Sequence, residues 1–541
     1  MKSFKKSVSL ILTVLIVFLT MATPVLAASK VDITEGPAKK IEAVFYMVLD
    51  KLISIVGKVL NTLIPGLDRG DAWQNYDDYE APDSFYEGED TFDTAVGADA
   101  VWSAGFAYAS LLEGLDVLSG EYYLAGSLRP VTPQVPTGIL DDQGVSVYAL
   151  SDGESGIVVQ AVVDGYGLAR GDVLKIREKL SSFAKEKGII SINVSALHQH
   201  SAIDTLGMGV ALAPALIQNP GMNAMGMDKE GMLSGKTEKF MNNLYEVVTE
   251  TVMEAVADME EGTLYYGSVD ASDLMYDKRN PWVVDEEIHR FRFDPADENS
   301  DEIWICEAGM HCTGISADDG NISSDYPYYF KKHIKETTGA DVVYVQGAEL
   351  AITVERDNVT VPSSVPGGKV GAYGIELANR VMSINNDVAL DPLRNITHSE
   401  VTIVADNPIL ILAVRQGIVD SVVVKKDGEL AVITEIGYME LGNKIGVALV
   451  PGEIAPEILW GGVVSADASW TGTMWEYPAW EKTSGTEKLL CFGINNDQVG
   501  YILADNDIHS MLTENEELNV AAKNAGSVMT KAFMNLVAEV K

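Results

Sequence analysis

From about residue 96 to the end of the chain, the apolar residues form two kinds of pattern that alternate along the sequence. Short aliphatic runs, which are typical of buried strands, alternate with longer stretches that carry apolar residues on one helical face. The predicted strands are Gly156–Val163, Ile189–Leu197, Glu302–Cys306 and Asp341–Gln346, and the predicted helices are Gly171–Lys187, Lys236–Met259, Tyr326–Thr338 and a terminal helix in Thr513–Lys541. Strands alternating with helices, with polar residues just beyond strand ends, indicate an α/β enzyme domain over residues 96–541 with no further module after it.

The N-terminus has the pattern of a secretory signal peptide. Lysines at the start of the chain precede an apolar run and a small-residue cleavage site at Ala27, so residues 1–28 are predicted to be removed on export. An uncleaved anchor is the alternative, but the apolar run is short for a membrane span. We therefore expect a secreted or cell-surface protein.

Two further segments precede the domain. In residues 29–66, positions 38–64 place apolar side chains on one helical face with lysines between them, which predicts an amphipathic helix. Such a helix fits two roles: peripheral contact with a membrane, or packing against the main domain. Residues 67–95 are rich in Asp, Glu, Tyr and Gly and predict an acidic linker.

Charge and cysteine content narrow the classes of protein further. The formal net charge is −40, and a surface this acidic repels phosphate backbones, so we expect no nucleic-acid partner. Three cysteines are too few for a disulfide framework. The sequence leaves open whether Cys306 pairs with Cys312, while Cys491 stands apart.

The strongest local signal for chemistry is a pair of histidines after a predicted strand. His198 and His200 are two residues apart, and in an extended chain such side chains lie on the same face. Two neutral imidazoles on one face supply half of a zinc site. An ordinary buried or surface histidine pair is an equally good interpretation of this motif alone.

Two more segments supply ligands of the type that zinc prefers. His311 follows an apolar strand, and Glu453 follows another apolar strand and a Pro-Gly turn. Imidazole nitrogens with a carboxylate oxygen favour zinc over harder cations. The sequence therefore predicts a zinc site built from several strand ends.

These segments resemble the neutral, non-lysosomal ceramidases. The segment Ala196–Ser201 is similar to the family signature THTHSG, and the preceding Val162–Asp164 and helix fit the segment before it. Further similarities follow in the family's order: Tyr265–Gly267 and Asp270–Ser272 resemble FYG…DAS, Met310–Gly314 resembles THGTS, Ser323–Asp325 stands where the family has SGD, Val450–Glu453 matches VPGE, and Asn496–Tyr501 resembles N-x-Y-x-x-Y. The resemblance spans residues 96–541 and implies a divergent, bacterial-like secreted member.

The resemblance implies a fold, a metal and a reaction. The fold is a large multi-layer α/β catalytic domain with mixed sheets flanked by helices. The metal is one zinc ion held by His198, His311, Glu453 and Tyr501, with His200, Asp164 and Tyr501 as catalytic candidates. The family hydrolyses the amide bond of ceramide, which places it in sphingolipid metabolism, and bound zinc makes water a nucleophile near neutral pH.

Two departures from the family pattern change the expected substrate. Gly347 stands where the family has the serine of its QSN segment, and Asp204 lies in the segment that replaces its glycine-rich tail. A glycine is expected to leave extra room beside the metal, and loss of one oxyanion donor costs about a hundred- to a thousand-fold in rate. We therefore predict a zinc-dependent hydrolase of N-acyl or ester bonds in a lipid-like substrate, with weak activity on ceramide.

Two other functions remain open at the level of sequence. The protein is a metal-retaining binding protein without turnover if the missing serine is indispensable. It is a metallo-phosphoesterase if Asp164, Asp204 and Asp325 add ligands for a harder metal.

Overall fold

A computed structural model of the chain describes residues 73–126, 134–208, 235–407, 410–411, 414, 419–509 and 516–541. The predicted signal peptide and amphipathic helix lie outside the described residues. None of the helices in the described ranges is long and apolar enough to cross a membrane.

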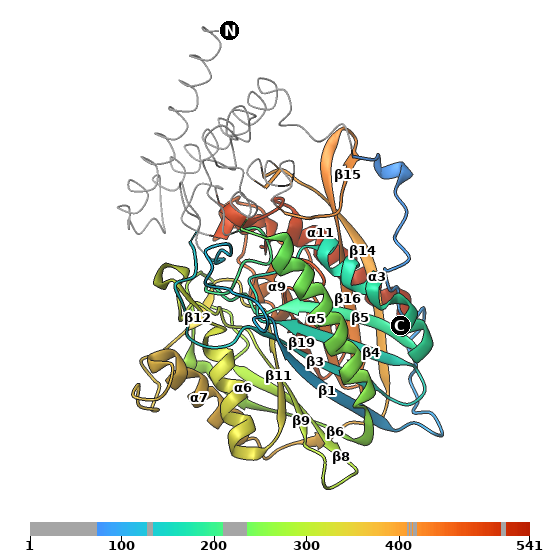
Figure 1. The fold of residues 1–541 in the computed structure, drawn as a ribbon. Helices are drawn as coiled ribbons and strands as arrows, with labels where there is room; N and C mark the ends of the chain where they lie inside the picture. Colours follow the sequence, from blue (N-terminus) through green and yellow to red (C-terminus); the bar gives the residue numbers. More distant parts are fainter. Residues whose placement is uncertain are drawn as a thin grey trace.

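A nine-stranded mixed sheet is the centre of the fold (Figure 1). Its spatial order is β11 (Asp341–Gln346), β9 (Ile303–Ala308), β8 (Glu287–Pro295), β6 (Glu260–Asp270), β1 (Trp102–Ser110), β3 (Gly144–Ser151), β4 (Ile157–Val163) and β5 (Ile189–Ala196), with β13 (Val388–Ala389) paired to β6. The two end pairs, β11–β9 and β4–β5, are parallel, and the pairs between them are antiparallel. Strand β11 also contacts β3, β4 and β5, so the sheet curls and brings its two parallel ends together.

A second sheet packs against this curled sheet. It runs in the order β14 (Arg394–Val404), β16 (Glu429–Leu441), β17 (Ile445–Leu449) and β19 (Lys488–Phe492), and β15 (Val423–Lys426) pairs with β16. Strand β19 contacts both β9 and β11. Three two-stranded pairs complete the strands: β2 (Gly138–Ile139) with β10 (Asn321–Ile322), β7 (Met275–Asp277) with β12 (Ile352–Val354), and β18 (Glu453–Ile454) with β20 (Tyr501–Ile502).

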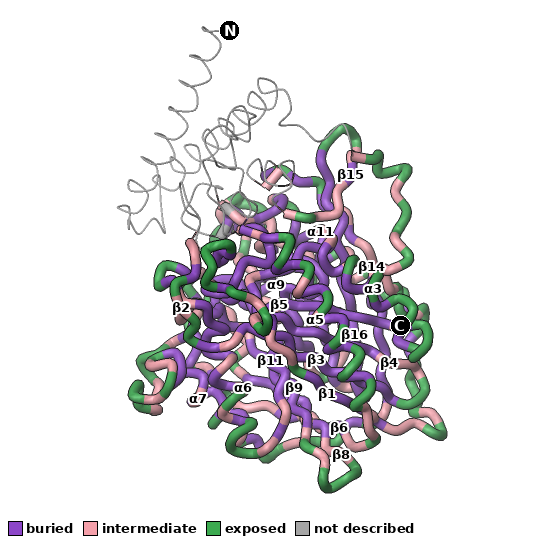
Figure 2. The backbone as a smooth tube through the Cα atoms, viewed as in Figure 1, coloured by how far each residue is buried: buried purple, intermediate pink, exposed green. Residues whose placement is uncertain are grey.

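Helices cover the outer faces of both sheets. The longer ones are α3 (Arg170–Lys187), α5 (Glu238–Ala257), α6 (Asp325–Thr338), α7 (Gly368–Met382) and α11 (Ala525–Val540), with short α9 (Pro456–Trp460) and α10 (Trp480–Ser484). Helix α5 crosses β1 and β3, α6 lies on β11, and α11 covers β14 and β16. Burial follows these layers, with the strands buried and the outer helical turns exposed (Figure 2).

Local sequence signals explain where the helices begin and end. The Thr237 side chain accepts a hydrogen bond from the Phe240 N–H at the start of α5, which satisfies one of the free amides there. Gly188 ends α3 with a φ of 73°, a left-handed conformation that glycine adopts without strain. The predicted α/β fold with mixed sheets flanked by helices is confirmed. The terminal helix is shorter than predicted, because α11 begins only at Ala525.

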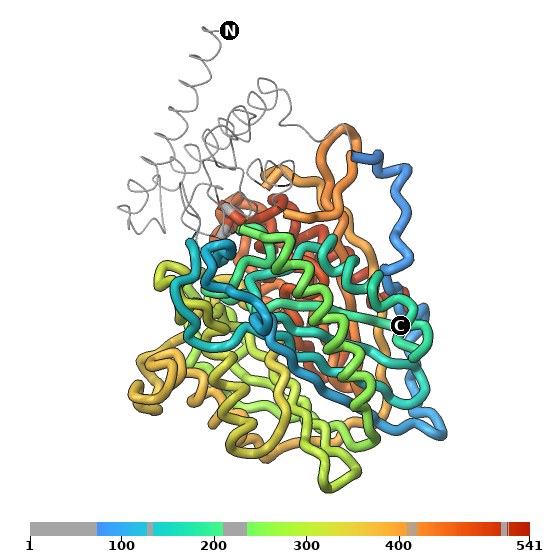
Figure 3. The backbone as a smooth tube through the Cα atoms, in the orientation of Figure 1, coloured from blue at the N-terminus to red at the C-terminus, as the bar shows by residue number. Residues whose placement is uncertain are grey.

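The described part of the predicted acidic linker, residues 73–95, is packed against the domain (Figure 3). Phe92 is buried in the core under the second sheet, and its N–H donates to the Val540 carbonyl. Glu89 pairs with Arg394, whose guanidinium is fully buried. The linker prediction is therefore wrong for these residues: their acidic composition hides an aromatic anchor and a carboxylate that neutralises a buried arginine.

The question of a disulfide is also settled for this structure. Cys306, Cys312 and Cys491 are all buried free thiols. Burial raises the pKa of the Cys306 thiol to about 12, so it behaves as a small apolar side chain.

Candidate metal centre

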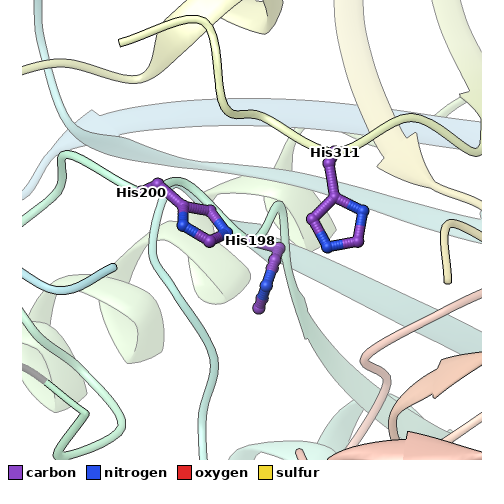
Figure 4. A group of neighbouring side chains, drawn as sticks. All are labelled: His198, His200 and His311. Carbon is purple, nitrogen blue, oxygen red and sulfur yellow. The ribbon is translucent and has the colours of Figure 1, made fainter. Parts of the chain in front are cut away.

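His198 and His311 come from opposite ends of the large sheet. His198 follows β5 and His311 follows β9, and the curl of the sheet brings these two strand ends to one place. Their imidazole centroids are 5.1 Å apart, and His200 lies 4.8 Å from His198 (Figure 4). The three imidazoles can therefore contact one small ligand.

The two-residue spacing of His198 and His200 works for a different reason than predicted. Strand β5 ends at Ala196, so neither histidine is part of an extended strand. His198 instead has a φ of 56°, in the left-handed region that non-glycine residues occupy at a cost. This turn, held by a hydrogen bond from Leu197 N–H to the Val163 carbonyl, directs the imidazole inward.

Glu453 and Tyr501 lie opposite each other on two paired strands at the centre. The Pro-Gly turn after β17 leads into β18, and β18 pairs in parallel with β20 so that Glu453 lies opposite Tyr501. Glu453 Oε2 is 3.0 Å from His311 Nε2 and 3.5 Å from His198 Nε2. The Tyr501 hydroxyl is 3.4 Å from His311 Nε2.

These spacings fit a tetrahedral zinc ion. Two ligand atoms on such an ion are about 3.3 Å apart, since each bond is about 2.0–2.1 Å long. The three measured separations, 3.0, 3.4 and 3.5 Å, lie around this value. Each of the four side chains that the resemblance implies thus lies at a ligand-to-ligand distance from at least one of the others.

In His198 and His311 the Nδ1 atom is held by a backbone carbonyl, so that Nε2 faces the centre. His198 Nδ1 lies 2.9 Å from the Tyr166 carbonyl, and His311 Nδ1 lies 2.9 Å from the Glu349 carbonyl. Each Nδ1–H can donate there, which turns the Nε2 lone pair toward the centre, as in metal-bound histidines. His198 Nε2 and His200 Nε2 are buried without a hydrogen-bond partner among the described residues. Buried polar atoms are normally paired, so these two indicate a missing ligand.

The electrostatics also favour a cation. Burial and the neighbouring His200 and His311 rings lower the pKa of His198 well below its usual value, and burial lowers the pKa of His200 to about 3. Both are therefore neutral, as metal ligands must be. Burial also disfavours a charge on His311, but Glu349 and Glu453 outweigh it and raise its pKa to about 9. In the metal-free protein a proton on His311 neutralises these carboxylates, and a metal ion would displace it.

Comparison with protein-family models and with curated protein sequences finds no match for this chain. Solved structures do match. The structure superposes on neutral ceramidase from Pseudomonas aeruginosa with a TM-score of 0.57 and 14% identity, over 81% of this chain and 74% of that one. The chain has a neutral ceramidase-like fold. A structure described as a ceramidase complexed with C2 matches with the same TM-score at 13% identity, over 81% of this chain and 75% of that one.

Two of the three candidate aspartates, Asp164 and Asp325, are already engaged in hydrogen bonds or an ion pair. Asp164 forms a buried ion pair with Lys331, with a nitrogen-to-oxygen distance of 3.1 Å, and accepts from the Gly144 N–H. Asp325 accepts from the N–H groups of Ile315 and Tyr326. Neither belongs to the groups of side chains that are close enough to share a metal ion. The catalytic assignment of Asp164 finds no support in this placement, because Lys331 already neutralises its carboxylate.

Asp204 likewise stabilises the turn in which it lies. Its carboxylate accepts from the N–H groups of Leu206 and Gly207, which is the usual behaviour of an aspartate in a tight turn. A harder metal held by Asp164, Asp204 and Asp325 together is therefore not what this geometry favours.

Sequence reasoning missed Glu349, whose carboxylate lies beside the histidine centre. Its ligand oxygen lies within 4.8 Å of the ligand atoms of His198 and Glu453, and its carboxylate is 3.8 Å from His311 Nδ1. Burial raises the pKa of Glu349 to about 8, against the opposing effect of His311. The signal was available: Glu349 follows strand β11 just as His311 follows β9, and parallel strands end at the same edge.

The space expected beside Gly347 is already filled. A Cβ atom at this position would lie 2.1 Å from Glu307 Oε1 and 2.9 Å from the Gly309 backbone nitrogen. The prediction of extra room beside the metal is therefore wrong. A side chain here would displace the Glu307 carboxylate and press against the Gly309 backbone, which favours glycine at this position.

An apolar cavity adjoins the centre. Its free volume is about 70 Å³, and Tyr166, Glu453 and Gln498 form part of its wall. Its other side chains are mainly aliphatic: Leu206, Met208, Ala405, Leu410, Ile411, Val414, Val419, Leu430, Val432, Val499 and Ala521. Its aliphatic lining, with a few polar groups at one part, suits an apolar part of a ligand.

Proposed function

We propose that this protein is a zinc-dependent hydrolase that cleaves an N-acyl amide or an ester bond in a lipid-like substrate. The observation that carries the proposal is that Glu453 lies at ligand-to-ligand distances from His198 and His311, and Tyr501 from His311, while the buried Nε2 of His198 is left without a hydrogen-bond partner. The neutral ceramidase-like fold supports the same reaction class by analogy. Bound zinc supplies Lewis acidity, which polarises a carbonyl and activates water near neutral pH.

The chain's own residues account for the positioning of the ligands and of water. Backbone carbonyls of Tyr166 and Glu349 hold the His198 and His311 rings in the orientation that faces the centre. Gln498 donates to Glu453 Oε1 at 2.9 Å, which leaves Oε2 directed at the two histidines. His200 Nε2 is buried and has no hydrogen-bond partner among the described residues, so it can accept a hydrogen bond from a water molecule at the centre and orient it.

The substrate class follows from the apolar cavity. Because Glu453 is part of both the cavity wall and the centre, an acyl chain in the cavity would place its carbonyl beside the candidate ligands. Burying each methylene contributes about 0.8 kcal/mol, so longer acyl chains should bind more tightly. We therefore propose that the cavity accepts the acyl part of the substrate.

The first test measures hydrolysis of N-acyl amides and acyl esters of increasing chain length by zinc-loaded protein. We expect activity that a chelator removes and zinc restores, with KM falling as the chain lengthens. Ile411→Glu, at a partly exposed position on the cavity wall, should raise KM for long chains at least about tenfold and leave short ones little changed. Val388→Glu, at an exposed valine outside the cavity, is the matched control.

The alternative, a binding protein that retains metal without turnover, gives a different result in the same assay. It predicts full metal content and no hydrolysis of any acyl substrate. Hydrolysis that is insensitive to both the chelator and Ile411→Glu would contradict the proposed chemistry and the proposed acyl site.

We also propose that the protein is exported, on the signal-peptide pattern of residues 1–28. N-terminal sequencing of protein from the culture medium is expected to begin just after Ala27. Retention of the intact N-terminus in the cell membrane would favour the uncleaved anchor.

A further inference from the structure

A second group of ligand-type side chains lies on strands β8 and β9, apart from the histidine centre. Asp285, Glu287 and His289 each offer one ligand atom, and these atoms lie within 4.8 Å of one another. His289 on β8 is directly paired with Glu307 on β9, so the Glu307 carboxylate faces the same group.

Two separations centred on His289 Nε2 are near those of ligands around one divalent cation. His289 Nε2 is 3.0 Å from Asp285 Oδ2 and 4.0 Å from Glu307 Oε2. These values lie on either side of the separation of about 3.3 Å expected for two ligands with bonds of about 2.0–2.1 Å to a tetrahedral ion. A small inward movement of the Glu307 carboxylate would complete the arrangement.

Glu307 is the observation that indicates a missing ligand. Its side chain is 2% exposed, and Oε2 has no hydrogen-bond partner among the described residues. An unpaired buried carboxylate oxygen is costly, and such groups are normally paired or bound to a metal. Burial and the neighbouring Asp285 raise the pKa of Glu307 well above its usual value, against the opposing effect of Lys488.

The charges around Glu307 leave room for a divalent cation. Three carboxylates meet here, from Asp285, Glu287 and Glu307. Lys488 contacts the first two, at 3.1 and 3.3 Å from its Nζ. With all three carboxylates ionised, Lys488 charged and His289 neutral, the formal sum is −2, which a divalent cation would balance; the bound cation would itself favour the ionised form of Glu307.

The surroundings of His289 suit a metal ligand. The Tyr266 hydroxyl lies 2.8 Å from His289 Nδ1 and can accept a hydrogen bond from it, which directs the Nε2 lone pair toward Asp285 and Glu307. The Glu287 side chain is 40% exposed, so the group is accessible from solvent on that side.

We propose that His289 Nε2, Asp285 Oδ2 and Glu307 Oε2 form a second site, for a divalent cation of the zinc or manganese type. One imidazole nitrogen with carboxylate oxygens is a donor set that suits these ions. The site ties β8 to the segment before it and to β9, so its role is to stabilise the sheet that carries His311. It does not depend on the hydrolase proposal, because it shares no residue with the histidine centre.

The test counts metal ions in protein equilibrated with zinc and then freed of excess metal. We expect two equivalents in the unaltered protein, one in His198→Ala, one in Glu307→Gln and none in the double variant. Zinc or manganese should also raise the melting temperature of His198→Ala but not of the double variant. Glu457→Gln, which alters a buried carboxylate outside both groups, is the matched control and should retain two equivalents.

Two outcomes separate this proposal from the hydrolase proposal. One ion that is lost in His198→Ala and retained in Glu307→Gln overturns the second site and leaves the first. One ion that is lost in Glu307→Gln and retained in His198→Ala does the reverse. If Glu307→Gln fails to fold, His289→Gln takes its place, with cooperative thermal unfolding as the criterion for a folded variant.

Discussion

Replacing His311 by alanine is expected to remove the metal ion of the histidine centre and to abolish hydrolysis. The side chain supplies one imidazole, and its loss leaves Glu453 and Glu349 facing each other without His311 between them. Replacing an outer partner of a metal ligand lowers metal affinity about 10–100-fold, and losing a ligand itself should cost more. Metal content measured by mass spectrometry, together with the rate on a long-chain N-acyl amide, checks both effects.

Two further variants make this test specific. Glu349→Gln keeps the shape of the side chain and removes its charge, so we expect weaker metal binding with the ion still present at saturating zinc. His333→Ala, which alters a histidine on α6 that contacts Asn379, should change neither quantity. Unchanged metal content in His311→Ala would show that the centre has been assigned to the wrong residues.

Replacing Gly347 by serine is expected to destabilise the fold and not to raise amide turnover. The new Cβ would overlap the Glu307 carboxylate and press against the Gly309 backbone nitrogen. Overpacking of this kind costs about 1–3 kcal/mol, and the backbone contact cannot be relieved by a side-chain rotation. Thermal or denaturant unfolding checks the loss of stability.

A double variant identifies the cause of that loss. In Gly347→Ser combined with Glu307→Ala, the side-chain overlap disappears while the backbone contact remains, so part of the stability should return. A Gly347→Ser protein that melts like the unaltered protein and hydrolyses amides faster would restore the original expectation from sequence, in which glycine leaves room beside the metal.

Much of the architecture was predictable because its signals are local. Strands β4 and β5 and helix α3 follow directly from aliphatic runs, one apolar helical face and a glycine at the end of the helix. The segment 73–95 was misjudged because composition averages over residues. A single phenylalanine and a single glutamate, Phe92 and Glu89, decide that it packs on the domain.

The candidate ligands could be named from sequence, but their assembly could not be derived from it. His198, His311 and Glu453 each follow a strand, and that position along the chain is a local property. His198 and His311 meet because the large sheet curls and brings β11 against β3, β4 and β5, and Glu453 joins them after β17 of the second sheet, whose β19 contacts β9 and β11. Pairing between distant strands is a long-range property, and no short window of sequence contains it.

The sequence by itself therefore determined the fold class and the residue types of the histidine centre. Only the tertiary structure decided which neighbouring groups act on them. Glu349 joins the centre because β11 runs parallel to β9, and Glu307 excludes a side chain at Gly347 because the same two strands lie side by side. The physical reason is that side-chain contacts between strands depend on register and on the packing of whole sheets, whereas periodicity and turn preferences act within a few residues.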